Sequence, residues 1–375
     1  MMCRFRAPLN SLNRNAKKLV LSFLVSSLAL TGSGCGETNS DESLLLQVDL
    51  SFAPEASAST DSSSDGLREE LRPQLPVTIL DVTGTEVTVE SVDRIIPLDG
   101  TVAEVVFALG LGPNVVATDM SATYPAEADS LPEIGYQRAL SAETIAVHSP
   151  TVLLATDIAG PPGVIDDLRK LGFALVIVPN ASGPNGPPEK IQAVAEALGI
   201  SERGKELANR VEAEIESATV TDTDYRPTVV SLYLRGASTQ LVLGRNSATH
   251  WIVEAAGGQR MAGILDLEGS ESISAEGLIV ASPEVILVPS AGLESVGGEE
   301  GLAQIGGLSQ TPAVENDAIV HFDDQWLLGN GPRVASLIEQ LSVVISDVRE
   351  KRKNLEDQWR CCGICCCFSS LCSGC

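Results

Sequence analysis

Two short segments contain residues that could bind ferric iron. Tyr136 precedes Arg138 by two positions, and Tyr233 precedes Arg235 by the same interval. In an extended segment, residues two apart lie on the same face of the chain. A neighbouring guanidinium favours the phenolate and so lowers the phenol pKa from its ordinary value of about 10. Phenolate is a hard oxygen ligand that suits ferric iron, and tyrosine is a known axial ligand of haem iron; the alternative is that both tyrosines are packing residues near a surface.

An internal repeat divides the chain into two related halves. Ser141-Ala142-Glu143 precedes Ser149-Pro150, and Ser274-Ala275-Glu276 precedes Ser282-Pro283, at an offset of 133 residues. In each copy the serine can cap a helix with the glutamate in its first turn, and the Ser-Pro step ends that helix before a β-branched run. The offset is too long for a solenoid unit and fits two lobes. Two lobes imply a cleft between them, and a cleft implies a ligand.

The N-terminal region predicts export. Residues 1–35 have a basic start, an apolar core from Leu19 to Leu30 and small residues before Cys35. Because this core is shorter than the ~18–20 residues of a spanning helix, we predict a signal peptide, with Cys35 lipidated after cleavage. Gly32 stands where a lipobox usually has leucine, which leaves ordinary signal cleavage as the alternative. Residues 36–75 are rich in Ser, Asp, Glu and Ala and predict a disordered acidic tether.

The charge balance limits the partners. The chain has 25 basic and 50 acidic side chains, and residues 1–34 hold five basic and no acidic ones. The remainder therefore carries 20 basic and 50 acidic side chains, a net charge of −30. Such a chain is repelled by nucleic acid and is not attracted to an anionic membrane surface. We expect no nucleic-acid partner, and a membrane contact only through the lipid anchor.

Hydrophobic periodicity predicts an α/β fold of two lobes. The N-terminal lobe spans 76–187, a helical segment with one long interlobe helix at 201–217 spans 188–225, and the C-terminal lobe spans 226–349. In the first lobe we expect a hairpin over 77–89, strands over 94–98, 115–119, 151–155 and 173–178, and helices over 102–109, 141–147 and 161–171. In the second lobe we expect strands over 229–234, 285–288 and 318–322, and helices over 250–256, 302–305 and 332–348.

Residues 93–349 resemble the haem-binding proteins of bacterial hemin ABC importers, within the cobalamin- and siderophore-binding class of two-lobed binding proteins. The resemblance covers the whole predicted fold and is carried by LDGTVAEVVFALGLG, TYPAEADSLPEIGYQRALSAE, LYLRGAS, ISAEGLIVASPEVILVP, GLESVGG and DDQWLLGNGPR. It implies the class III periplasmic binding protein fold, in which one long helix bridges two Rossmann-like lobes with little domain closure.

The resemblance also implies a haem site. Tyr136 stands where relatives have an axial iron ligand, sometimes His, and Arg138 stands where a basic residue faces the haem propionates. Tyr233 and Arg235 match a Tyr-x-Arg pair of Gram-positive relatives, in which the tyrosine binds iron and the arginine supports the phenolate. The iron would then have two tyrosinate ligands, or one tyrosinate and a switchable second ligand; both options stay open.

Two glutamates complete the resemblance. Glu143 and Glu276 stand where relatives dock one glutamate per lobe onto arginines of the membrane permease. The resemblance therefore implies a monomeric haem-binding lipoprotein on the outer face of the cytoplasmic membrane, or in the periplasm. It would pass haem to the permease and ATPase of an ABC importer for iron acquisition. One alternative is a siderophore- or cobalamin-binding protein of the same fold, and another is a surface haem scavenger or sensor that never meets a permease.

Several other residues are assigned no role in binding. We expect Tyr124 to shape its loop and Glu104 to be a solvated helix side chain. The sequence has no glycine-rich phosphate loop, Ser-His-Asp arrangement or catalytic carboxylate pair, so we expect a binding protein and not an enzyme. Residues 361–375 hold seven of the nine cysteines, and Cys362-x-x-Cys365 has metal-ligand spacing. Because an exported cysteine cluster risks scrambled disulfides, we expect 350–375 to lie outside the fold, with a metal-binding appendage as the alternative.

Overall fold

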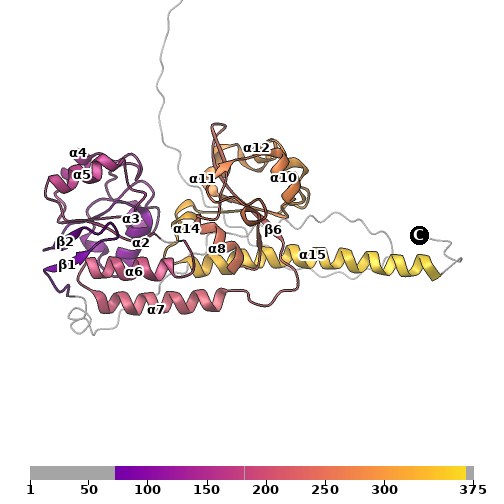
Figure 1. Cartoon of the computed structure of the whole chain (residues 1–375), viewed down its shortest axis with the longest axis horizontal. Helices are drawn as coiled ribbons and strands as arrows, with labels where there is room; N and C mark the ends of the chain where they lie inside the picture. The colour runs from indigo at the N-terminus through magenta and orange to yellow at the C-terminus, as the bar shows by residue number, and fades with distance from the viewer. Residues whose placement is uncertain (1–71, 181, 369–375) are drawn as a thin grey trace, which may run out of the picture. The chain divides into compact units, whose positions relative to one another are not determined.

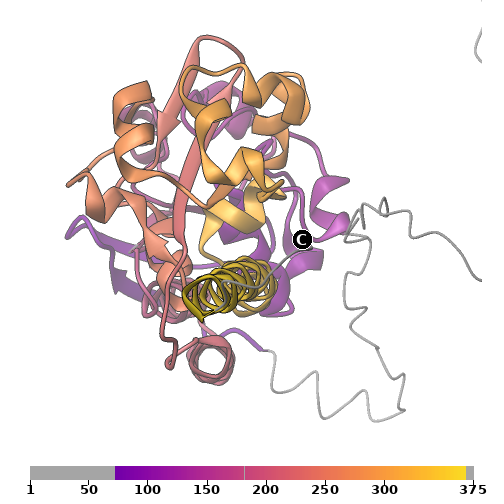
Figure 2. The ribbon, with the colours of Figure 1, turned by 90° about the vertical axis from the view of Figure 1, so that its right-hand side faces the viewer.

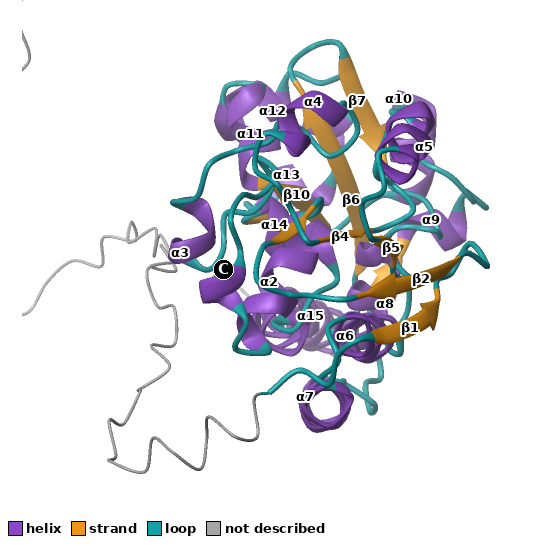
Figure 3. Ribbon diagram, turned by 90° about the vertical axis from the view of Figure 1, so that its left-hand side faces the viewer, coloured by secondary structure: helices purple, strands orange, loops and turns teal. Residues whose placement is uncertain are grey.

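The computed structural model describes residues 72–180 and 182–368, which begin with an antiparallel hairpin (Figure 1). Its strands are β1 (Val77–Leu80) and β2 (Glu86–Val89), paired from Val77 to Val89. The hairpin packs on α6 (Gly186–Ala197), as Figure 3 shows. The predicted signal peptide, Cys35 and the tether up to residue 71 lie outside the described residues.

The N-terminal lobe is built on a parallel sheet in the order β3-β4-β5. Alternate residues of β4 face opposite cores: Val152 and Leu154 point to one side, and Leu153 and Ala155 to the other. The elements of this lobe are β3 (Ile95–Pro97), α2 (Gly100–Ala108), α3 (Ala126–Asp129), α4 (Ala142–Ala146), β4 (Val152–Ala155), α5 (Pro162–Lys170) and β5 (Leu175–Ile177). The predicted parallel βαβ arrangement is confirmed.

The C-terminal lobe contains a mixed sheet in the order β11-β10-β6-β7-β9, with β8 also paired to β6. Strands β6, β10 and β11 are parallel, and β7 and β9 extend the sheet antiparallel. The strands are β6 (Thr228–Arg235), β7 (Thr239–Val242), β8 (Gln259–Arg260), β9 (Glu271–Ser272), β10 (Val285–Pro289) and β11 (Ile319–Phe322). The helices are α8 (Ala248–Ala255), α9 (Met261–Ile264), α10 (Ala275–Ala281), α11 (Ser290–Ser295), α12 (Gly298–Ala303), α13 (Pro312–Glu315), α14 (Asp324–Gly329) and α15 (Val334–Phe368).

Helices α6, α7 (Ser201–Ala218) and α15 connect the lobes through one hydrophobic core. Figure 2, which looks along α15, shows α7 beside it. Buried Leu207, Val211 and Ile215 form the inner stripe of α7 at helical spacing. The long interlobe helix predicted at 201–217 is thus present, and the two-lobed α/β fold is confirmed.

Several local features differ from the predictions, and the helix expected over 302–305 is observed as α12 (Gly298–Ala303). The expected strand over 115–119 forms only isolated bridges, from Val115 to Ile95 and from Thr118 to Glu133, because the chain turns at Ser121. Strand β7 was not predicted, since its four residues follow a tight Gly236 turn. The last helix was expected to end at Val348, yet α15 continues to Phe368.

The extension of α15 has a local cause. Its first residues, 349–353, are good helix formers, and Arg352 pairs with Glu356 one turn later at 3.1 Å. Arg352 also reaches the C-terminal lobe, with a 3.2 Å ion pair to Glu284 and its guanidinium 4.1 Å from the ring centroid of Tyr225. The first residues of the 350–375 segment therefore contact the lobe. The last turns of α15 include Cys361 to Cys367, and residues 369–375 lie outside the described residues.

Candidate ligand-binding site

Tyr233 and Arg235 lie at the carboxyl end of β6, where parallel α/β sheets usually bind ligands. Their shared face brings the Arg235 guanidinium carbon to 4.5 Å from the Tyr233 ring centroid. This is the stacking geometry of a cation–π contact. The Tyr-x-Arg spacing thus produces a side-chain pair, as expected for residues two apart in a strand.

Two hydrogen bonds and the contact with the Tyr233 ring hold the guanidinium of Arg235 in position. Its Nη2 donates to Oδ2 of Asp324 at 2.5 Å, and its Nη1 donates to the carbonyl oxygen of Leu234 at 2.8 Å. Asp324 Oδ1 also accepts from the Ala291 backbone nitrogen at 3.1 Å, so one carboxylate joins β6, α11 and α14. A Cβ on Gly292 would lie 3.1 Å from the carbonyl oxygen of Leu234, a tight contact with backbone that favours glycine at this position.

Tyr136 comes from the loop between α3 and α4 and is 37% exposed. Its hydroxyl lies near enough to Tyr233 to raise the pKa of that phenol, so the structure brings the two tyrosines predicted as iron ligands near each other. Arg138 is exposed two residues further along the same loop. Two phenol oxygens at one place could together ligate a ferric iron, with arginines nearby to meet anionic groups.

The pKa of Tyr233 is raised, not lowered. Burial of the phenol is the largest cause, and the neighbouring Tyr136 hydroxyl and the Asp324 carboxylate add to it. Arg235 acts in the opposite direction, as the sequence led us to expect, but its effect is smaller than that of burial. Arg235 thus lowers the pKa of Tyr233 as expected, but the net shift is upward because burial outweighs the guanidinium. The phenol of Tyr233 is therefore neutral at pH 7 in the free protein.

Buried Asp119 holds the Tyr136 loop in place. Its carboxylate accepts hydrogen bonds from Ser121 Oγ at 2.9 Å and from the Ser121 backbone nitrogen at 3.2 Å, and the Gln137 backbone lies near enough to act on the pKa of this carboxyl. The adjacent Met120 nitrogen donates to the Gly135 carbonyl oxygen at 3.0 Å. Burial raises the pKa of Asp119 to about 7, and repulsion from Asp99 adds to the effect. The backbone beside Tyr136 is therefore fixed by a carboxyl that titrates near neutral pH.

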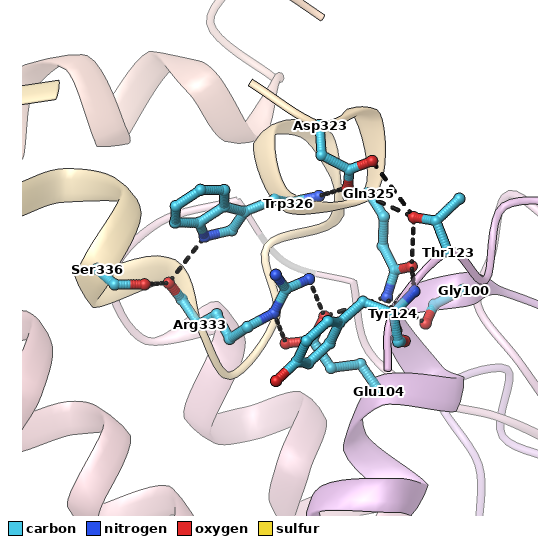
Figure 4. Close-up of polar contacts among 9 residues, drawn as sticks. All are labelled: Gly100, Glu104, Thr123, Tyr124, Asp323, Gln325, Trp326, Arg333 and Ser336. Carbon is cyan, nitrogen blue, oxygen red and sulfur yellow. Dashed lines mark hydrogen bonds and ion pairs between the residues drawn. The ribbon is translucent and has the colours of Figure 1, made fainter. Parts of the chain in front are cut away.

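A buried polar cluster joins the Tyr124 loop of the N-terminal lobe to α14 (Figure 4). This cluster, called the polar seam below, consists of Glu104, Tyr124, Gln325 and Arg333. Gln325 Oε1 accepts from the Tyr124 backbone nitrogen at 2.9 Å, and its Nε2 donates to the Gly100 carbonyl oxygen at 2.9 Å and to Glu104 Oε2 at 3.1 Å. Gln325 is only 7% exposed. One amide thereby connects α2, α14 and the loop that leads to Tyr136.

Glu104 and Arg333 form the ionic part of this seam. The guanidinium donates to both carboxylate oxygens, at 2.9 and 3.0 Å, and its carbon lies 3.6 Å from the Tyr124 ring centroid. Glu104 is 4% exposed, so the expectation of a solvated side chain is wrong. The helical pattern could not reveal this burial, because the partner lies 229 residues away. Tyr124 stacks on Arg333, in keeping with a role in shaping the loop.

The two predicted docking glutamates lie on the surface. Glu143 is exposed in the first turn of α4, and Glu276 is exposed in the first turn of α10. Ser141 Oγ donates to Glu143 Oε2 at 2.6 Å, and this hydrogen bond lowers the pKa of the carboxyl. The sequence analysis did not identify Asp324 or Asp119 as residues that position the site. For Asp324, the available signal was its place in the first turn of α14, the helix that follows β11.

The described part of the chain has no helix that is both long and apolar enough to cross a membrane. Nor do three or more His, Cys, Asp or Glu side chains in these ranges cluster as ligands for a bare metal ion. Tyr136 and Tyr233, which the sequence analysis predicts as iron ligands, lie near each other in this structure.

Comparison with known proteins identifies the family. Residues 95–326 match the model described as periplasmic binding protein. The periplasmic haem-binding protein RhuT from Roseiflexus sp. RS-1 is 43% identical, with a TM-score of 0.66 over 68% of this chain and 98% of that one. The haem-binding protein HmuT is 32% identical, with a TM-score of 0.69 over 73% and 91%. A vitamin B12-binding protein of Vibrio cholerae (strain ATCC 39541) is 23% identical over 66% of this chain and 87% of its own. The chain belongs to the periplasmic binding protein family, in the form with two α/β lobes bridged by a long helix.

Proposed function

We propose that this protein binds ferric haem outside the cytoplasm and delivers it to the permease of an ABC importer. Proteins of this family are extracytoplasmic ligand-binding proteins rather than enzymes, and the relatives RhuT and HmuT are named as haem-binding proteins. The observation that carries the proposal is the meeting of Tyr136 and Tyr233, one from each lobe, with Arg235 stacked on Tyr233.

In this proposal the Tyr233 phenolate is an axial ligand of the haem iron, and Tyr136 is the second ligand or a replaceable one. Arg235 stabilises the phenolate once it forms, because a guanidinium beside a phenol favours its anionic state. Arg138, exposed on the Tyr136 loop, would face the haem propionates. Burial of Tyr233 keeps the phenol neutral until the iron arrives.

Titration of the protein with ferric haem tests the proposal. The wild-type protein should bind one haem at saturation with a tyrosinate charge-transfer band, and Tyr233→Phe should abolish that band. Tyr136→Phe should either abolish the band or shift it, which ranks the two ligands. Tyr225→Phe is the matched control, because Tyr225 lies at the opposite end of β6 and bonds to Glu284. If no saturable haem binding is seen, the haem proposal fails.

Cobalamin is the second candidate ligand, because curated relatives named vitamin B12-binding proteins match 66–70% of the chain at 20–23% identity. A parallel titration with cyanocobalamin separates the two ligands. Saturable cobalamin binding that survives Tyr136→Phe and Tyr233→Phe would favour this candidate over haem.

Docking and anchoring complete the proposal. Glu143 and Glu276 would each meet a basic residue of the permease, one from each lobe. Lipidation of Cys35 would hold the protein at the outer face of the membrane. Mass spectrometry of the mature N-terminus, and haem transport after Glu143→Lys and Glu276→Lys, test these two parts separately.

A further inference from the structure

Helices α4 and α10 have the same local structure in the two lobes. Ser141 Oγ accepts a hydrogen bond from the Thr144 nitrogen at 3.5 Å, and Ser274 Oγ accepts one from the Gly277 nitrogen at 3.3 Å. After each helix a serine adopts a left-handed backbone conformation before a proline, Ser149 with φ 48° and Ser282 with φ 44°. The repeat in the sequence is therefore also a repeat in the conformation of the surface.

An exposed valine stands at the same place in both copies. Val147 is 76% exposed and Val280 is 74% exposed, and each follows the glutamate of its helix by four positions. Residues four apart lie on the same side of a helix, so each valine is beside its glutamate. One exposed valine is ordinary on a protein surface. A valine with nearly the same exposure stands at corresponding positions of the two lobes, and this correspondence suggests that both valines serve the same role.

Neither valine contributes to the lobe interior. Within the same two helices, the residues buried in the lobe cores are Ile145 in α4 and Leu278 and Ala281 in α10. In the second copy Ile279, 56% exposed, adds to the apolar surface beside Val280. Each lobe thus presents a carboxylate and a branched apolar side chain together, and both are free to meet another molecule.

We propose that Val147 and Val280, each with its neighbouring glutamate, form two matching docking surfaces for the two equivalent subunits of an ABC permease. The chemistry of each surface fits a partner with a cationic side chain next to an apolar hollow. The duplication fits a partner that presents that surface twice. This inference rests on the proposed delivery to a permease and extends its contact from a pair of charges to a mixed surface.

The apolar half of each surface has a distinct physical role. The electrostatic attraction of an exposed carboxylate speeds the encounter with a cationic partner, and salt weakens this attraction. A valine that becomes buried at an interface adds affinity that salt does not weaken. The valines should therefore account for most of the binding that remains at high ionic strength.

Binding to the permease–ATPase complex of the same organism, reconstituted in lipid nanodiscs, tests the inference. Val147→Ser and Val280→Ser should each weaken binding about tenfold at high salt, and the double variant about a hundredfold. Haem affinity should be unchanged in all three variants, because the valines lie on the exposed faces of α4 and α10, whereas the tyrosines lie on the loop before α4 and on β6. Val343→Ser is the matched control, since Val343 is 60% exposed on α15 and lies outside the repeat.

The outcomes separate the inference from the proposed function. If the serine variants bind the importer as tightly as wild type and the control, the apolar docking surfaces are refuted while glutamate docking stands. If the wild-type protein binds haem but not the importer, both docking proposals fail. If the wild-type protein docks but binds no haem, the docking surfaces stand and the cargo proposal fails.

Discussion

The guanidinium of Arg235 lies over the ring of Tyr233, with its carbon 4.5 Å from the ring centroid. Asp324 determines this position, because its carboxylate accepts from the guanidinium at 2.5 Å while also bonding the Ala291 nitrogen. A carboxylate that orients a residue supporting a metal ligand commonly affects metal affinity as strongly as some ligands do. Direct side-chain contacts therefore join Tyr233, Arg235 and Asp324, and the sequence pattern reveals two of these three residues.

Asp324→Ala should weaken ferric haem binding about tenfold, because the guanidinium is no longer held against Tyr233. Arg235→Ala should have a similar effect, and the double variant should be no worse than Arg235→Ala if Asp324 acts only through Arg235. Haem titrations of the four proteins give the measurement, with exposed Asp166→Ala as control. Additive losses in the double variant would contradict the assignment of Asp324 as a positioning residue.

Haem affinity should increase with pH. The raised pKa of Tyr233 means that the free protein carries a neutral phenol at pH 7, so ligation as phenolate must release one proton. The dissociation constant for haem should then fall about tenfold per pH unit, because one proton leaves Tyr233 for each haem bound. Titrations at pH 6, 7 and 8 measure the slope, and Tyr233→Phe should flatten it relative to wild type. An equal slope in wild type and Tyr233→Phe would exclude this residue as the proton-releasing ligand.

Asp119→Asn should change the pH dependence of stability. The folded-state pKa of about 7 lies above the ordinary value of 3.8, so the stabilising contribution is complete below pH 3.8 and is lost as pH rises through 7. The variant should therefore resemble wild type at pH 3.5 and be more stable at pH 8, by at most about 4 kcal/mol. Denaturant unfolding at both pH values measures this, with exposed Asp129→Asn as control. Equal gains at both pH values would contradict the assignment.

Glu104→Ala should lower the free energy of unfolding by about 3–5 kcal/mol, because it leaves the Arg333 guanidinium in the seam without its carboxylate. Arg333→Ala should have an effect of similar size, since Glu104 is 4% exposed and would lose both hydrogen bonds. Asp167→Ala is the matched control: it removes the exposed ion pair to Lys170, whose loss should cost less than about 1 kcal/mol. A small effect for Glu104→Ala would mean that water replaces the lost partner.

Local patterns in the sequence determined the framework of this protein. Some elements could be predicted because their patterns depend only on neighbours within a few residues. These patterns are the helical spacing of apolar residues in α7, the Ser-Pro steps after α4 and α10, and the β-branched runs of β4 and β10. The Tyr233 and Arg235 contact was predictable for the same reason, since two residues of a strand share a face.

Only the tertiary structure determined which distant residues meet. Asp324 lies 89 residues from Arg235 and Arg333 lies 229 residues from Glu104, so no local pattern could reveal that both side chains are paired. The direction of the Tyr233 pKa shift depended on burial, which the sequence does not specify, and burial outweighed the nearby guanidinium. The sequence thus determined the elements and their candidate ligands, whereas long-range packing determined the burial and charge environment in which those ligands act.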